Sequence, residues 1–440
     1  MKIKLLSILV ASSIGAATPA LAADNAAIMK RLDQLEAQRQ ADQSEIQSLR
    51  SKIQQLEAQK SAPVSSTEAA QLREEIVKVD KKASQRIDSV KKSIQGDQDK
   101  LKINGYMSVY GVKSTNEAAT LGSGIDNHIG FNSDTIAGIQ FDYRLDEKID
   151  AVVQLQAEGK DDYSLETPWA FLRYKLAPST TLRAGRMVAP LYLYADSIDV
   201  GYTYAWVRPP VEMYNTERVQ YTGVDLIHNF DLAGWDSSVQ ILFGDNDGNT
   251  NGAELRGDYT TGIALTFNND AWTLRLADNY TANLSVNGLD NFADSVTYLS
   301  ASVRYDNGAL LVLAEGRRIE AGALLEALVS DSDGFYATIG YQINNFMPYA
   351  TWAKAYSVEE NLLPGVLPQT QESIGLGVRY NLTDKVVVKG EATQYDGFNG
   401  TSGVSGFATL PTNPVARADA LQKLDEDGAT VMSLGIDAVF

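Results

Sequence analysis

Seven basic residues between positions 173 and 389 are candidates for binding anions. They are Arg173, Lys175, Arg183, Arg186, Arg208, Arg275 and Lys389. A guanidinium group can hold a carboxylate through two parallel hydrogen bonds, and rings of Arg and Lys make a pore favour anions. We therefore expect an anion-binding constriction, provided that the fold turns these side chains toward one another.

The spacing of these residues about short turns predicts their relative heights. Arg173 and Arg183 lie about equally far from a turn at Pro178, so we expect them to be near neighbours. Arg275 and Lys389 lie at a similar height above turns of their own. Lys175 is expected on the inward face beside Arg173, Arg186 at a strand end, and Arg208 in a long loop.

A second interpretation of the same basic residues remains open. They could pair with Asp142, Glu158 or Asp225 and simply line the hydrated inner wall of the barrel. Arg304 and Arg379 are expected lower on the same inner surface. The two interpretations differ in whether the donors of each Arg or Lys are free to meet a solute.

The elements that must position these residues are strands. From Leu101 onward apolar and polar residues alternate with a period of two, as in 149–158 and 373–380. Such alternation is typical of strands with one apolar and one polar face. Sixteen segments of this kind follow one another, and the last of them ends the chain at Phe440.

Short and long connections alternate between these segments, and each short one contains turn-forming residues. The seven short ones are 145–148, 177–179, 231–234, 268–270, 306–308, 344–345 and 382–384. Eight longer loops, such as 187–216 and 396–428, complete the pattern. Because a sheet in lipid must close to pair its backbone groups, we predict an all-β transmembrane barrel of 16 antiparallel strands over 101–440.

Aromatic residues flank the short turns, which is a separate indication of a membrane barrel. The pairs Phe230 with Trp235, Phe267 with Trp272 and Tyr341 with Phe346 are examples. Their position suits the membrane–water boundary, where such barrels carry aromatic girdles. The alternative is the ordinary aromatic core of a soluble β-protein.

The first 100 residues predict two further segments. Residues 1–23 have the charged start, short apolar middle and small-residue end of a secretory signal peptide. Residues 24–100 indicate a periplasmic α-helical coiled coil and stalk, with apolar residues spaced by four and three between Ile28 and Leu56. Such a seam requires a partner chain, although its residues do not decide between dimer and trimer.

Composition and motifs argue against several classes of protein. The net charge of −18 speaks against nucleic-acid binding, and the lack of cysteine removes disulfides and thiolate metal sites. His128 and His228 have no evident catalytic partner, so we expect no enzyme and no cofactor. Residues 247–258 match a calcium loop in part but lack its flanking helices, and we do not predict a metal there.

Two stretches carry a resemblance to a known family. Residues 182–186, Leu-Arg-Ala-Gly-Arg, and the loop 199–212, Asp-Val-Gly-Tyr-Thr-Tyr-Ala-Trp-Val-Arg-Pro-Pro-Val-Glu, make the chain similar to the DcaP-like outer-membrane porins. The resemblance implies a trimeric channel with a periplasmic coiled coil and a sixteen-stranded barrel. It also implies that loop 187–216 folds into the lumen, and that dicarboxylates are taken up.

The sequence thus predicts a porin in the outer membrane of a Gram-negative bacterium. The expected function is passive diffusion of small organic anions, with outer-membrane lipid and lipopolysaccharide as further partners and a homotrimer as the assembly. Because the chain is acidic, a general or cation-preferring porin is the first alternative. The second alternative is a structural envelope tether or adhesin that uses the coiled coil as a stalk.

Overall fold

The computed structural model describes residues 100–117, 119–214, 219–250, 253–286, 293–322, 331–358, 369–403 and 408–440. The chain divides into two compact units, 1–99 and 100–440. All of the described residues belong to the second unit. The signal peptide and almost all of the predicted helical stalk therefore lie outside the described residues.

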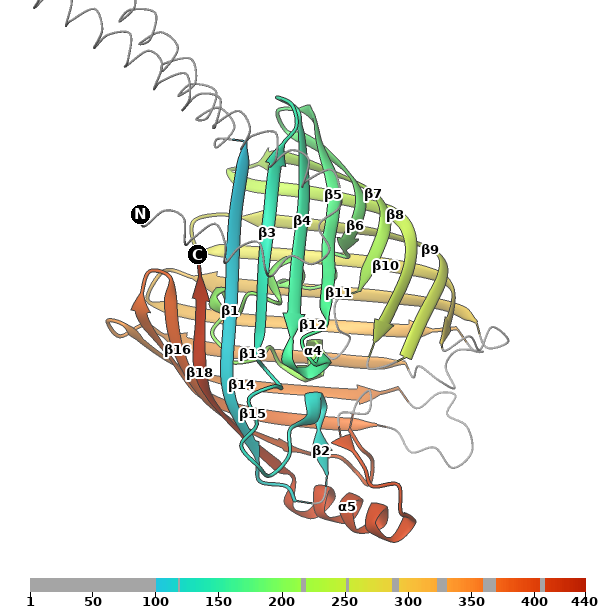
Figure 1. Cartoon of the computed structure of the whole chain (residues 1–440), viewed down its shortest axis with the longest axis vertical. Coiled ribbons are helices and arrows are strands. Elements are labelled where there is room, and N and C mark those ends of the chain that lie inside the picture. The colour runs from blue at the N-terminus through green and yellow to red at the C-terminus, as the bar shows by residue number, and fades with distance from the viewer. Residues whose placement is uncertain are drawn as a thin grey trace, which may run out of the picture. The chain divides into compact units, whose positions relative to one another are not determined.

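Sixteen antiparallel strands form a closed barrel, which confirms the predicted fold of this unit. Each strand pairs with its neighbours in the chain, and β18 closes the barrel by pairing with β1 (Figure 1). The strands are β1 (Leu101–Ser114), β3 (Ile136–Arg144), β4 (Ile149–Glu158), β5 (Leu165–Ala177), β6 (Thr180–Val188), β7 (Gln220–Leu232), β8 (Trp235–Thr250), β9 (Ala253–Asn268), β10 (Trp272–Val286), β11 (Asp294–Asp306), β12 (Leu310–Ala321), β13 (Ser332–Tyr341), β14 (Phe346–Ser357), β15 (Thr370–Thr383), β16 (Val386–Asp396) and β18 (Ala429–Val439).

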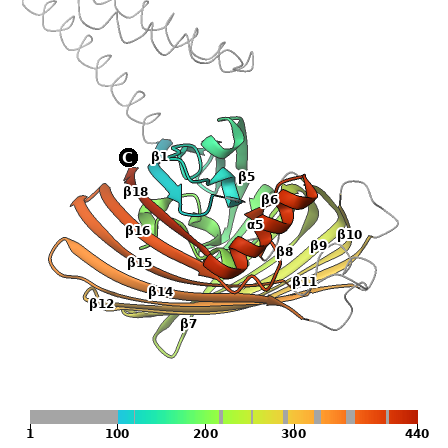
Figure 2. The same cartoon turned by 90° about the horizontal axis from the view of Figure 1, so that it is seen from below.

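The connections carry a few short elements. The two-residue strands β2 (Thr120–Leu121) and β17 (Ala408–Thr409) pair with each other. The helices are η1 (Gly122–Gly124), η2 (Gly159–Asp161), η3 (Ala195–Ser197), η4 (Gly201–Thr203), α4 (Val211–Tyr214) and α5 (Pro414–Asp427). Both β2 and α5 lie at the end of the barrel away from the C-terminus (Figures 1 and 2). The C-terminus thus marks the end of the barrel that carries the short turns.

The seven short turns fall where the sequence predicts them. At the turn between β7 and β8, Ala233 and Gly234 have φ of 53° and 83°. Positive φ at both central residues is the turn geometry that matches the twist of two hairpin strands. Such turns keep successive strands in register, so the alternation of faces continues from one strand to the next.

The outward faces of the strands are apolar. Leu274 and Leu276 of β10 point outward, and Arg275 between them points inward. Near the short turns, exposed aromatic rings touch across neighbouring strands, as between Trp272 and Tyr305, whose centroids are 4.7 Å apart. An apolar belt edged by aromatic residues is the outer surface that lipid requires of such a barrel.

Phe440 completes the closing strand. Its backbone N–H donates to the Gly105 carbonyl at 2.9 Å, and its carbonyl accepts from Gly105 N–H at 2.8 Å. The ring lies over Gly105, where a Cβ would come within 2.2 Å of it. A side chain at 105 would therefore displace the terminal aromatic ring from the seam between β18 and β1.

Candidate functional site: the lumen and the loop inside it

The connection between β6 and β7 runs through the interior of the barrel. This inner loop comprises residues 189–219, apart from 215–218, which lie outside the described residues. Trp206 Nε1 donates to the hydroxyls of Thr338 in β13 and Thr351 in β14, at 3.1 and 2.9 Å. Both threonines lie on the polar, inward faces of their strands, so the loop occupies the lumen.

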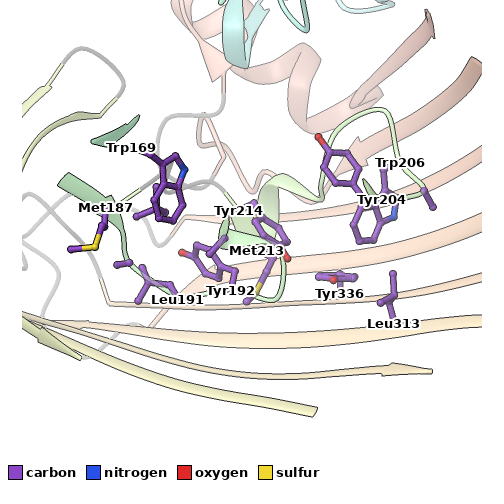
Figure 3. Close-up of a cluster of buried hydrophobic side chains, with 14 of the residues drawn as sticks. Trp169, Met187, Leu191, Tyr192, Tyr204, Trp206, Met213, Tyr214, Leu313 and Tyr336 are labelled. Carbon is purple, nitrogen blue, oxygen red and sulfur yellow. The ribbon is translucent and has the colours of Figure 1, made fainter. Parts of the chain in front are cut away.

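Aromatic side chains give the inner loop a core of its own (Figure 3). Trp206 packs edge-on against Tyr336 of β13 with centroids 5.3 Å apart, and Tyr192 lies 5.0 Å from Tyr214. The cluster continues to Trp169 of β5. Because these rings fill part of the lumen, any route for a solute is narrow beside them.

Lys389 of β16 is fully buried and binds the loop backbone. Its Nζ donates to the carbonyls of Gly201 and Trp206, at 2.6 and 2.7 Å. The third partner is Asp437 of β18, at 2.8 Å. An ammonium group has three donors, and here all three are used inside the protein.

Two arginines hold other parts of the loop in the same manner. Arg379 of β15 donates to the carbonyls of Tyr202 and Tyr204, at 2.7 and 2.9 Å. Arg275 of β10 donates to the carbonyl of Pro190 at 2.9 Å. The shortest hydrogen bonds of both guanidinium groups are thus made to peptide oxygens of the loop.

A third arginine holds the short helix α4. Arg317 of β12 donates to the carbonyls of Glu212 and Met213, both at 3.1 Å. These residues belong to the last part of the loop before it returns to β7. Sequence reasoning missed Arg317, although its inward position two residues from Glu315 was visible in the alternation of β12.

Acidic side chains of the same wall accept from the amides of the loop. Glu315 of β12 accepts from Leu193 N–H at 3.0 Å, and Glu391 of β16 accepts from Val207 N–H at 3.1 Å. Irregular backbone at membrane depth must find partners for its amides and carbonyls. We call β10, β12, β15 and β16 the anchoring wall, because their charged residues supply those partners.

Arg208 ties the inner loop to the first long loop. Its guanidinium forms a two-pronged ion pair with Asp134 and donates to Ser433 of β18 at 3.3 Å. Burial by itself would lower the pKa of Arg208, but the charge of Asp134 and its hydrogen bond together outweigh burial and raise the pKa above its ordinary value. Arg208 therefore remains charged and has its donors committed within the protein.

Arg183 of β6 lies in a closed network of side chains. It forms a two-pronged ion pair with Asp225 of β7, which also accepts from Tyr221 at 2.9 Å and from Gln240 at 2.7 Å. The guanidinium also lies over the ring of Trp169, 5.6 Å from its centroid. This pairing is the one that the second interpretation of the sequence anticipated.

Arg173 and Lys175 of β5 are different, because they are partly open to solvent. Their side chains are 34% and 48% exposed. Arg173 lies 3.7 Å from Asp142 and from Asp150, and Lys175 lies 3.6 Å from Asp150. These separations exceed normal hydrogen-bond lengths, so the ion pairs are loose. The register also pairs Arg173 with Arg183 across β5 and β6, as predicted.

Arg186 faces away from the lumen. It pairs in register with Ala170 and Thr222, on the face opposite to that of Arg183, and it donates to Gln220. The structure thus corrects the expected constriction in two ways. Arg186 points outward, whereas Arg183, Arg208, Arg275 and Lys389 are occupied by the protein itself.

Asp196 adds an acidic group to the inner loop. It lies in η3, is exposed, and is within electrostatic range of Arg183 and Tyr221. It therefore lies on the side of the barrel that carries Arg183. No pattern in the sequence marked this residue, because the loop has no regular period.

The end of the inner loop also contains a buried carboxyl group. Glu212 is 1% exposed and accepts from Gln371 of β15 at 2.9 Å, and its second oxygen has no hydrogen-bond partner among the described residues. Burial raises the pKa of this carboxyl above its ordinary range. Burial likewise raises the pKa of Tyr214 well above its usual value.

The described residues offer neither a metal site nor a helical membrane span. Among them, no three His, Cys, Asp or Glu side chains gather as a metal site would need. The possible calcium loop at 247–258 lies partly outside the described residues. None of the described helices is both long and apolar enough to cross a membrane.

A closed barrel with an apolar outer belt, a polar inner face and a loop in its lumen defines a channel of the outer-membrane type. The chain belongs to the Gram-negative porin family, whose model matches residues 83–400. This family places it in the outer membrane, and points to a channel rather than an enzyme. No curated protein matches the sequence.

Solved structures agree on the fold. The chain is similar to OmpF of Salmonella typhi, solved in complex with daunomycin, with 16% identity and a TM-score of 0.51 over 77% of this chain and 97% of that one. It is also similar to an anion-selective porin from Comamonas acidovorans, with 12% identity and a TM-score of 0.51 over 77% of this chain and 99% of that one. At these identities the likeness shows the fold alone.

Proposed function

We propose that this porin allows small organic anions, dicarboxylates in particular, to diffuse passively across the outer membrane. The observation that carries the proposal is the state of Arg173 and Lys175. Both are partly exposed, and neither has its donors committed to a short hydrogen bond with the carboxylates beside it. A carboxylate that leaves water needs charged donors in its place, and these two can supply them.

The arrangement suits a solute with two carboxylates. Arg173 and Lys175 project from the same face of β5, two residues apart, which is about 7 Å along a strand. Asp196 of the inner loop lies within electrostatic range of Arg183, the cross-strand neighbour of Arg173. A narrow passage between an acidic loop and basic strands orders a charged solute along its length.

The alternative is a general or cation-preferring porin. It is favoured by the carboxylates of Asp142 and Asp150, which stand beside the two exposed cations and partly cancel their field. The net charge of −18 favours it too. Screening over about 8 Å at physiological salt limits the reach of the acidic loops, so the groups at the constriction dominate.

The assembly is part of the proposal. We propose a homotrimer in contact with outer-membrane lipid and lipopolysaccharide, with a cleaved signal peptide at 1–23 and a periplasmic coiled coil over 24–100. The resemblance in residues 182–186 and 199–212 supports it, as does the heptad spacing between Ile28 and Leu56. A tether or adhesin would use the same stalk but conduct no ions.

A planar-bilayer experiment distinguishes these functions. The purified, full-length protein is inserted into a bilayer with a salt gradient, and the zero-current potential is recorded. We expect open channels, and we expect the sign of the zero-current potential to show that anions permeate more readily than cations. A cation-selective potential would support the alternative porin, and the absence of any conductance would support the tether.

A further inference from the structure

We propose that Lys389 and Asp437 form a latch that fixes the position of the inner loop and thereby sets the width of the pore. This inference goes beyond the proposed solute preference. It rests on the proposed function only in one respect, namely that the protein forms a conducting channel. Lys389 and Asp437 are positioning residues, since both are buried and reach no solute. Through Asp437, the closing strand β18 also helps to fix the position of the inner loop.

The contacts of the latch meet at one point of the loop. Lys389 Nζ reaches the carbonyl of Gly201 on one side of the loop and that of Trp206 on the other. Its ammonium also lies over the ring of Tyr204, 4.7 Å from the centroid. Figure 3 shows Tyr204 and Trp206 close together, with ring centroids 6.0 Å apart. One side chain therefore gathers residues 201–206 into a single bend.

At Gly201 the backbone of the loop closely approaches the side chains of the barrel wall. A Cβ at this position would lie 2.4 Å from Asp437 Oδ1 and 2.9 Å from the hydroxyl oxygen of Ser108. The backbone of the loop thus rests directly on the inner face of β1 and β18. A larger residue at 201 would have to displace the Asp437 carboxylate and the Ser108 hydroxyl, or move the loop away from these strands.

Asp437 links the latch to the closure of the barrel. It lies on β18, in register with Ser108 of β1 and Val387 of β16. Its Oδ2 accepts from Tyr110 of β1 at 2.7 Å as well as from Lys389. The residue that neutralises Lys389 is therefore also bonded to the first strand of the barrel.

A buried ion pair such as Lys389 with Asp437 stabilises the loop only when both partners are present. Two charges taken out of water are compensated by each other and by hydrogen bonds, and removing one partner leaves the other uncompensated. Replacing both together avoids the orphan charge. The pair therefore predicts non-additive effects of substitution, which a double-mutant cycle measures.

The test compares Lys389→Met, Asp437→Asn, the double variant and Lys389→Arg with the wild-type porin in bilayers. The matched control is Lys354→Met, which also removes a lysine from an ion pair, with Glu372, but on the outward face of β14. Unit conductance, open-channel noise and the zero-current potential are recorded. Heat-modifiability on gels reports whether each barrel is folded.

We expect Lys389→Met to raise unit conductance and noise while the barrel stays heat-modifiable. We also expect Lys389→Arg to stay close to wild type, and the double variant to be less affected than the sum of the single ones. Unchanged conductance and noise in folded Lys389→Met would overturn the latch, as would an equal change in Lys354→Met. If the wild-type protein showed no conductance, the proposed function would be refuted instead.

A second variant covers the case in which Lys389→Met does not fold. Arg379→Gln removes the hydrogen bonds to the carbonyls of Tyr202 and Tyr204, within the same bend, and leaves the pair of Lys389 and Asp437 intact. We expect a smaller rise in conductance and noise than a broken latch would give. A folded Arg379→Gln porin that conducts as wild type does would overturn the claim that anchoring of this bend sets the pore width.

Discussion

Arginine and lysine side chains on two walls of the same barrel have different roles. On the anchoring wall, Arg275, Arg379 and Lys389 donate to peptide carbonyls of the inner loop. On the other side, which we call the open wall (β3 to β7), Arg173 and Lys175 face carboxylates at a distance and remain partly exposed. The acceptor that each side chain meets therefore decides its role.

The difference arises from where the chain must hide irregular backbone. A loop inside a barrel carries amides and carbonyls that have no strand partner, and each buried one must be satisfied. Basic and acidic side chains with several donors or acceptors do this efficiently. Within the described part of the chain, Arg173 and Lys175 donate to no carbonyl of the loop, so these side chains are left to water and to solutes.

The largest effect is expected from Asp225→Asn, on the open wall. Asp225 is fully buried and accepts from Arg183, Tyr221 and Gln240, so its loss leaves Arg183 without a counter-ion. Breaking a buried ion pair from one side costs about 3–5 kcal/mol. We expect a clear drop in the temperature at which the barrel unfolds on gels.

The control for Asp225→Asn is Asp142→Asn, in the loose pair with Arg173. Its 3.7 Å separation and partial exposure predict a cost within about 1 kcal/mol. Equal unfolding temperatures for the two variants would show that the tight and the loose pair do not differ as the structure indicates.

A smaller effect is expected from Trp206→Phe on the inner loop. The variant loses the hydrogen bonds from Trp206 Nε1 to Thr338 and Thr351, but these hydroxyls remain bonded to each other at 2.8 Å. The cost should be about 1 kcal/mol, with increased channel noise. Trp352→Phe, on the outward face, should leave the noise unchanged.

The smallest effect concerns pH and Glu212. Because burial raises its pKa in the folded protein, Glu212 takes up a proton on folding when the pH lies between its unfolded pKa of about 4.3 and the raised pKa of the folded state. Its contribution to stability is present below that value and is lost as pH rises through the raised pKa. Glu212→Gln should flatten this part of the curve of unfolding temperature against pH.

Glu320→Gln, at an exposed position, is the control for that measurement. If Glu212→Gln and Glu320→Gln give the same dependence of unfolding temperature on pH as the wild type, Glu212 does not take up a proton on folding in this pH range.

Much of the fold could be predicted because strand and turn signals are local. Alternation with a period of two predicts which residues share a face, and turn residues predict where strands reverse. Together they placed Arg173 opposite Arg183, which the register confirms. The misplacement of Arg186 came from treating it as part of a strand end, although the same alternation assigns it to the outward face.

The roles of the inward cations could not be predicted in this way. Whether Lys389 meets a solute or a carbonyl depends on the path of residues 189–219, which have no repeating pattern. A usable signal lies in the strands themselves. Inward-facing acid–base pairs two residues apart, such as Glu315 with Arg317 and Lys389 with Glu391, mark strands that must satisfy a buried partner.

The central claim is that the exposed cations of the open wall select the solute. It is tested most directly by measuring the block of ion current by succinate in wild type, in Arg173→Gln/Lys175→Gln, and in Arg186→Gln/Lys354→Gln. The last pair removes the same charge from the outward face. We expect block to weaken by about one to two decades in the first variant only, since charge-assisted hydrogen bonds contribute about 1.5–3 kcal/mol and ~1.4 kcal/mol is tenfold. Equal block in all three proteins would contradict the claim.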